Sequence, residues 1–146
     1  MGLVADAALA AGAPVIGVIP QALVDRECAH RGCTELHIVD TMHERKRMMA
    51  EQADAFLALP GGIGTFEELF EVWTWRQLGY HDKPIGLLNT AGYYDKLLDF
   101  LGSSTSQDFM GSWQMGLMRS ATDAPELLAE LVSAAGMSPA PRLDRI

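Results

Sequence analysis

Cysteine and basic residues are scarce in this chain of 146 residues, and each scarcity excludes classes of protein. The two cysteines, Cys28 and Cys33, are too few for a disulfide framework and fit a reducing compartment. Eleven Lys and Arg stand against nineteen Asp and Glu, a formal charge of −8. This charge disfavours nucleic-acid and anionic-membrane binding, which need clustered cations, but it is compatible with one small anionic ligand held locally.

Targeting and membrane signals are also lacking. The apolar start over residues 1–20 has no basic residue at its beginning and is interrupted by Asp6. Met1-Gly2 resembles a myristoylation start, yet Asp6 stands where Ser or Thr is required. No apolar run is long enough to cross a bilayer. We therefore expect a cytoplasmic protein with no membrane partner.

With 49% apolar and 21% charged residues, the chain has the composition of one globular domain, expected at 1–136, followed by a flexible tail at 137–146. Apolar runs predict strands at 15–19, 36–39, 55–59, 85–88 and, more weakly, 117–120. Helical patterns fall at 2–11, 42–53, 65–79, 93–101 and 125–135. Continuous apolar strands separated by helices predict an α/β fold with a parallel sheet covered on both faces.

A glycine-rich loop, Pro60-Gly61-Gly62-Ile63-Gly64-Thr65, follows the third predicted strand and leads into a helix. Glycines let backbone N–H groups approach a ligand, and a helix N-terminus favours phosphate. The loop is not a Walker motif, because no Lys follows the last glycine, nor a dinucleotide fingerprint, because Glu67 occupies its third glycine position. The alternative is a tight turn with Thr65 as the N-cap of the helix.

Glu68 also has two interpretations. Thr65-x-x-Glu68 has the spacing of a capping box, in which Glu68 bonds back to the backbone of Thr65. On a helical wheel Glu68 instead shares a face with Glu71, Val72 and Trp75, a mixture that indicates a cleft wall or a contact with another subunit. Spacing alone leaves cap and catalyst open.

A basic helical turn follows the second predicted strand. Thr41-x-x-Glu44 is a second capping box. Arg45 and Lys46 flank the inward line of this helix, while Arg47 points to solvent. The inward line consists of Met42, Met49 and Ala53. Two cations beside an apolar stripe favour a bound anion, and the alternative is that their long stems extend to water.

Together these segments resemble a known family. Residues 60–68 match the PGGxGTxxE motif of the Lonely Guy family of cytokinin riboside 5′-monophosphate phosphoribohydrolases, and residues 42–46 resemble its MHxRK segment. The similarity runs from residue 1 to about residue 131. It implies a Rossmann-like doubly wound sheet, a homodimer, and no metal or redox cofactor. It also implies hydrolysis of the N-glycosidic bond of an adenosine- or cytokinin-type riboside 5′-monophosphate, which releases free base and ribose 5-phosphate.

The resemblance assigns roles to individual residues. The catalytic arginine and glutamate of the family fall on Arg45 and Glu68. Lys46 would add positive charge to the same pocket, and Met42 is a candidate for a purine contact. The phosphate would be held by Gly61, Gly62, Gly64 and Thr65.

The chain departs from the family at its front. Family members carry a strand, a helix and a second strand with a GGGxxGLMG loop before the point that corresponds to residue 1, so we expect the sheet to lack the first strands. A non-catalytic nucleotide- or cofactor-binding carrier of the same fold is therefore the rival hypothesis, and Arg45 with Glu68 favours the enzyme. Proteins of this type are often labelled lysine decarboxylases, but the chain holds only Lys46, Lys83 and Lys96, and no pyridoxal phosphate site is apparent.

Cys28-x-His30-x-x-Cys33 with His37 could be drawn as a zinc cluster. The spacing departs from the usual zinc-ligand layout, and His37 falls in a predicted buried strand. We expect no metal site.

Overall fold

The computed structural model describes residues 1–26 and 29–136. The predicted tail at 137–146 lies outside these residues. The chain divides into two compact units, Met1–Gln52 and a second unit that begins at Ala53, and each is described by itself. The assignment of 1–136 to one domain stays a prediction.

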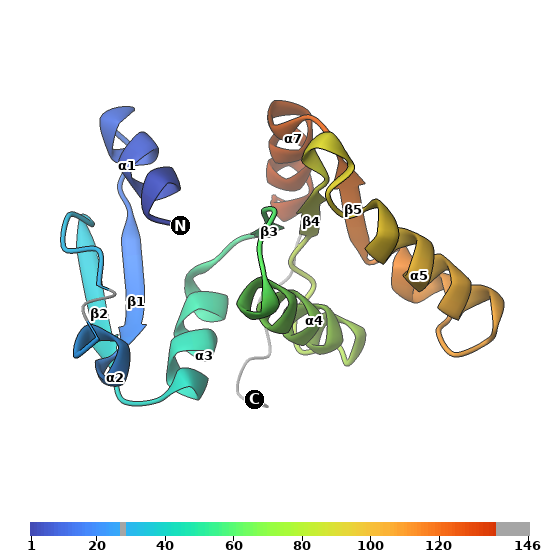
Figure 1. Ribbon diagram of the computed structural model, residues 1–146, viewed down its shortest axis with the longest axis horizontal. Helices are drawn as coiled ribbons and strands as arrows, with labels where there is room; N and C mark the ends of the chain where they lie inside the picture. The colour runs from blue at the N-terminus through green and yellow to red at the C-terminus, as the bar shows by residue number, and fades with distance from the viewer. Residues whose placement is uncertain (27–28, 137–146) are drawn as a thin grey trace. The chain divides into compact units, whose positions relative to one another are not determined.

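The first unit is built on two parallel strands. Its elements are α1 (Gly2–Ala10), β1 (Ile16–Pro20), α2 (Gln21–Val24), β2 (Glu35–Val39) and α3 (Met42–Gln52). In the register, Ile16 lies opposite Glu35 and Pro20 opposite Val39, and the two strands run side by side in Figure 1. α3 packs on both strands, and its Ala50 is buried.

The second unit contains a parallel sheet of three strands in the order β3-β4-β5. Its elements are β3 (Phe56–Ala58), α4 (Ile63–Gln77), β4 (Ile85–Leu88), η1 (Thr90–Gly92), α5 (Asp95–Ser106), α6 (Ser112–Met115), β5 (Met118–Ala121) and α7 (Ala124–Ala135).

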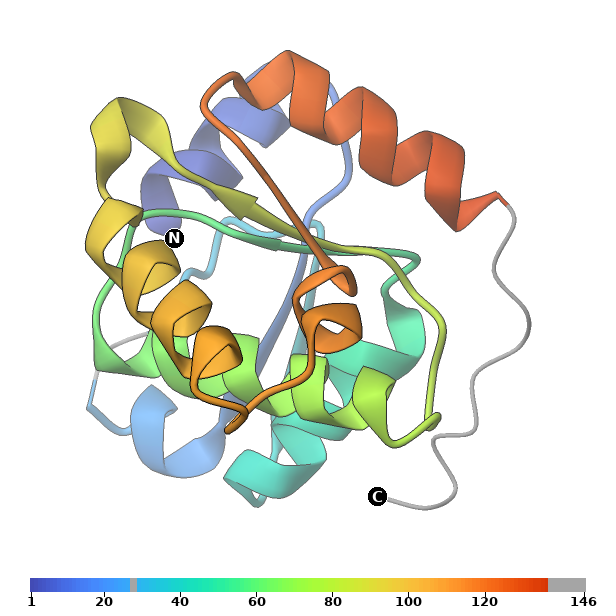
Figure 2. The ribbon, with the colours of Figure 1, turned by 90° about the vertical axis from the view of Figure 1, so that its right-hand side faces the viewer.

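Helices cover both faces of this sheet, as Figure 2 shows. Ile85 and Leu87 on one face of β4 belong to a core cluster with Leu69 and Trp73 of α4 and Leu101 of α5. On the opposite face, Leu88 packs with Leu127 and Leu131 of α7. Successive residues of a strand point to opposite faces, and both faces of this sheet are covered. All four residues of the central strand β4 are therefore buried.

The parallel α/β class is thus confirmed, together with the predicted strands and the main helices. The described strands form two sheets where one was expected, since their ladders join β1 to β2 and β3, β4 and β5 to one another. The short helices α2 and α6 were not predicted, and α5 continues to Ser106 rather than ending at 101. Within the described part of the chain, every helix is too short or too polar to cross a membrane.

Candidate functional site

The glycine-rich loop joins the carboxyl end of β3 to α4. Gly62 is the N-cap, with φ −100° and ψ −152°, and the first helical residue is Ile63. The Phe66 amide donates to the Gly62 carbonyl over 3.1 Å and so opens the helical ladder. The amides of residues 63–65 precede that ladder and lie at the positive end of the helix dipole, an arrangement that favours an anion.

The glycines leave this backbone open to a ligand. A Cβ atom placed on Gly62 or Gly64 would meet no heavy atom within 4 Å, and Ile63 between them is 85% exposed. Gly61 serves a different purpose, since a Cβ there would collide with the side chain of Thr65. The loop therefore combines a tightly packed turn at Gly61 with accessible backbone at the two following glycines.

The interpretation of Thr65 as N-cap is wrong. Because the glycines let the chain enter the helix at Ile63, Thr65 is the third helical residue and its side chain lies against Gly61. Thr65 and Glu68 therefore do not form the capping box that their spacing indicates. Glu68 lies in the second turn of α4 and is half-buried, whereas its neighbour Glu67 is exposed.

The face of α4 that carries Val72 and Trp75 is largely covered within the chain. Val72 packs against the core cluster of the second unit, and Trp75 is 8% exposed. Trp75 is thus buried within its own chain, and the contact with another subunit that its position on the helical wheel indicated stays a prediction.

Two tyrosines outside the loop, which the sequence analysis missed, hydrogen-bond to the backbone at its start. The Tyr93 hydroxyl donates to the Gly61 carbonyl over 2.7 Å, and the Tyr94 hydroxyl donates to the Leu59 carbonyl over 2.6 Å. The available signal was positional: the pair follows β4, which lies beside β3 in the sheet.

The basic turn lies in the first unit, at the start of α3. Its capping box is confirmed: the Thr41 amide donates to Glu44 Oε2 over 3.0 Å, and the Glu44 amide donates to Thr41 Oγ1 over 3.1 Å. Arg45 and Lys46 are half-buried while Arg47 is exposed, as predicted. Arg45 Nε donates to the Val18 carbonyl over 3.1 Å, which ties this side chain to β1.

Met42 differs from its prediction. It is 44% exposed rather than inward, and Ala50 is the fully buried residue of α3. As the first residue of the helix, Met42 is accessible to a ligand. The candidate residues thus fall into two sets, one at the start of α3 in the first unit and one at the start of α4 in the second.

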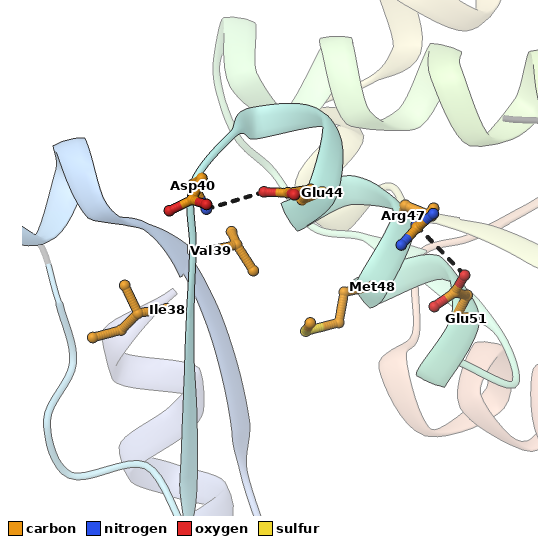
Figure 3. A pocket seen from close by; sticks show the side chains of 7 residues that line it. All are labelled: Ile38, Val39, Asp40, Glu44, Arg47, Met48 and Glu51. Atoms are coloured by element: carbon orange, nitrogen blue, oxygen red, sulfur yellow. Dashed lines mark hydrogen bonds and ion pairs between the residues drawn. The ribbon is translucent and has the colours of Figure 1, made fainter.

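A cavity of about 260 Å³ lies between β2 and another face of α3, as Figure 3 shows. It is lined by Ile38, Val39, Asp40, Glu44, Arg47, Met48 and Glu51. Glu44 is engaged in the cap, and Arg47 Nε lies 3.6 Å from Glu51 Oε1. With three carboxylates and one guanidinium, this lining disfavours a phosphate. Arg45 and Lys46 are not among the residues that line the cavity.

The two histidines of the drawn zinc cluster each contact a carboxylate outside it, and His30 also lies near Cys33. His30 Nε2 lies 2.8 Å from Asp6 Oδ1, and its Nδ1 lies 3.7 Å from Cys33 Sγ. His37 is not buried as expected; it is partly exposed, with Nε2 3.5 Å from Glu35 Oε2. Cys28 lies outside the described residues. In residues 1–26 and 29–136, no group of three or more His, Cys, Asp or Glu is arranged to hold a metal ion.

Parallel strands, each followed by a helix, define an α/β protein, and a glycine-rich turn with open backbone joins β3 to α4. Residues 1–131 match the family model described as "Possible lysine decarboxylase". The chain belongs to this family, which includes the Lonely Guy proteins.

Three relatives illustrate the match. The chain is 50% identical over 128 residues to "Cytokinin riboside 5'-monophosphate phosphoribohydrolase LOG2" of Arabidopsis thaliana, which covers 88% of this chain and 60% of the relative. It is 48% identical over 131 residues to "Cytokinin riboside 5'-monophosphate phosphoribohydrolase LOG1" of Arabidopsis thaliana, and the match covers 90% of this chain and 62% of the relative. It is 50% identical over 131 residues to "Probable cytokinin riboside 5'-monophosphate phosphoribohydrolase LOGL1" of Oryza sativa subsp. japonica, covering 90% and 59%. The chain thus spans about 60% of the length of these relatives.

Proposed function

We propose that this protein hydrolyses the N-glycosidic bond of a purine riboside 5′-monophosphate, with AMP or a cytokinin-type nucleotide as substrate. In this reaction the bond between the ribose C1′ and the purine nitrogen breaks, the hydroxyl of water adds to C1′, and a proton passes to the base. The observation that carries the proposal is the glycine loop at the start of α4, where the open glycines Gly62 and Gly64 lie at the positive end of a long helix. The names of the relatives, phosphoribohydrolases, support it.

The 5′-phosphate would be bound by the glycine loop. The amides at residues 62–65 supply hydrogen-bond donors, and the Thr65 hydroxyl adds a polar group beside Gly61. Gly62 and Gly64 suit this role because a larger residue would place a side chain where the phosphate oxygens approach.

Arg45 is proposed as one of two catalytic residues, which contacts the phosphate or ribose and holds the substrate. Its bond to the Val18 carbonyl fixes Nε and leaves the planar guanidinium in a set orientation, which suits bidentate recognition of an anion. We assign Lys46 a supporting charge and Met42, accessible at the start of α3, a contact with the purine.

Glu68 is proposed to act on the reacting carbon. Departure of the base leaves positive charge on the ribose, so the transition state resembles an oxocarbenium ion. A carboxylate near C1′ stabilises this charge and can orient or deprotonate the attacking water. The position of Glu68 one turn beyond the phosphate loop fits this role, because the loop fixes the substrate that the carboxylate must meet.

We further propose that residues 1–136 act as one nucleotide-binding domain, that the protein works as a homodimer in the cytoplasm, and that neither a metal nor a redox cofactor takes part. Light scattering on the purified protein tests the dimer, and base release in the presence of EDTA tests the independence from metal.

The central test is release of free base, followed by chromatography after incubation with AMP and with isopentenyladenosine monophosphate. Glu68→Gln should abolish release while AMP still binds, because the amide keeps the shape of the side chain and removes the charge. The matched control is Glu67→Gln on the adjacent exposed position, which should keep full activity.

Equal loss of binding and turnover in Glu68→Gln would show that Glu68 is structural. Binding of AMP without any release by the unmodified protein would favour the carrier hypothesis instead.

A further inference from the structure

The Tyr93–Tyr94 pair is placed by a short hydrogen-bonded connection after β4. Asn89 is buried, its side-chain oxygen accepts from the Tyr94 amide over 2.6 Å, and its Nδ2 donates to Asp95 Oδ1 over 2.8 Å. Between Asn89 and Tyr93 the chain turns through Ala91 at φ +52° and Gly92 at φ +70°. The turn directs two successive aromatic side chains toward the end of β3.

The buried member of the pair anchors the end of the strand. Tyr94 is 1% exposed, and its ring meets Phe66 of α4 with centroids 6.2 Å apart. Burial raises the pKa of Tyr94 above its usual value of 10.0, which by itself already keeps the hydroxyl protonated at neutral pH. Its acceptor, the Leu59 carbonyl, precedes Pro60, whose peptide has no N–H. Tyr94 therefore fixes where the glycine loop begins.

The second tyrosine acts one peptide further on. The Gly61 carbonyl, which accepts from Tyr93, belongs to the same peptide unit as the Gly62 N–H. The peptide bonds of the described residues are trans, so this carbonyl and this N–H point in opposite directions. A hydrogen bond that holds the carbonyl toward Tyr93 consequently holds the Gly62 N–H away from it.

This control matters because the bond from the Phe66 amide holds the Gly62 carbonyl, which belongs to the next peptide unit and not to the one that carries the Gly62 N–H. The φ and ψ of Gly62 lie in the extended region, it has no side chain, and the space around its Cβ position is open. A glycine in such surroundings can rotate its peptide at little cost. The Gly62 N–H directly precedes the amides of residues 63–65 at the start of α4.

We propose that Tyr93 is a positioning residue for phosphate binding, which fixes the orientation of the Gly62 amide through its bond to the Gly61 carbonyl. The inference rests on the proposed function to the extent that the glycine loop binds the 5′-phosphate. In this proposal the Tyr93 hydroxyl acts through the backbone of the loop. Loss of the hydroxyl therefore weakens phosphate recognition and leaves recognition of the nucleoside unchanged.

The test compares Tyr93→Phe with Tyr80→Phe, since the chain has three tyrosines and Tyr80 follows the opposite end of α4. Dissociation constants for ribose 5-phosphate, AMP and adenosine are measured by calorimetry on the full chain, with the midpoint of thermal unfolding recorded for each variant. Loss of one hydrogen bond to the loop should weaken ribose 5-phosphate and AMP about fivefold in Tyr93→Phe, which corresponds to roughly 1 kcal/mol. Adenosine, which lacks the phosphate, should bind as to the unmodified protein, and Tyr80→Phe should change none of the three.

Two results would overturn the proposal. Unchanged affinity for ribose 5-phosphate in Tyr93→Phe would show that the Gly62 amide needs no such support. Parallel weakening of adenosine and AMP would show a general structural role for the hydroxyl.

Failure of the proposed function gives a different pattern. If the unmodified protein binds ribose 5-phosphate but releases no base, the hydrolase assignment fails and the Tyr93 comparison still decides the positioning role. If it binds no ribose 5-phosphate, the phosphate site and the role of Tyr93 fail together.

Discussion

Acidification should destabilise the second unit through His81. This residue is 3% exposed in the connection between α4 and β4, and its ring lies 5.2 Å from that of Phe56. Nε2 lies 3.0 Å from the Val72 carbonyl and must donate to it, while Nδ1 accepts from the Lys83 amide over 3.1 Å. Both nitrogens are thus used by one neutral tautomer, and a proton on Nδ1 would face the Lys83 N–H.

The surroundings of His81 lower the pKa of its imidazole. Burial is the main cause that lowers its pKa, and Arg76 and Lys83 lower it further, against the Val72 bond and Asp82. The unfolded chain therefore takes up a proton at a higher pH than the folded protein. Stability from His81 is complete above the unfolded pKa of about 6.5 and is lost as the pH falls below it. If His81 stays neutral when folded, the loss between pH 7.5 and pH 5.5 reaches at most about 1.4 kcal/mol.

Urea unfolding followed by tryptophan fluorescence measures this loss, because Trp73, Trp75 and Trp113 all belong to the second unit. The comparison is His81→Gln, whose amide can donate and accept but does not titrate. The free energy of unfolding of the unmodified protein should fall more steeply than that of the variant between pH 7.5 and pH 5.5. Parallel loss in the two proteins would refute the argument, because groups other than His81 would then account for the pH dependence.

Two further predictions concern packing and capping. Gly86→Ala should cost about 1–3 kcal/mol by the same urea assay, because the added Cβ would lie 2.8 Å from Leu131 Cδ1. Gly102→Ala in α5, where a Cβ meets nothing within 4 Å, is the control, and equal stability of the two variants would contradict the packing argument. Glu44→Ala removes the acceptor of two amides at the start of α3 and should lower stability by about 1 kcal/mol. Glu51→Ala, which removes an exposed ion pair, should cost less in circular-dichroism melts, and an equal cost would argue against the cap.

Local rules were sufficient where one signal dominated. The apolar run at 85–88 predicted β4, because a strand buried on both faces needs apolar residues throughout. The Thr41–Glu44 capping box was also correct.

Local rules failed where backbone freedom or distant neighbours decided. Glycines at 61 and 62 let α4 begin at Ile63, which displaced Thr65 from the cap position its type and spacing favour. α5 continues to Ser106 through a Ser- and Thr-rich end of low helix propensity, although the Ser104 and Thr105 hydroxyls donate to carbonyls four residues earlier, a contact that slightly destabilises helices. Helices of four residues, such as α2 and α6, are too short to show a period.

In the candidate site, too, the residues with a local sequence signal could be predicted and those that depend on distant neighbours could not. Gly62, Gly64 and Arg45 could be proposed from sequence because each lies where a strand passes into a helix, and parallel topology puts such positions at the ligand-binding edge of a sheet. Tyr93 and Tyr94 could not, because their acceptors lie more than thirty residues earlier and come within reach only when β4 pairs with β3. The groups proposed to bind the ligand are thus encoded locally, whereas the bonds that hold them depend on the register of the sheet. A substitution that shifts this register would therefore disturb the backbone of the loop without altering any residue of the glycine motif.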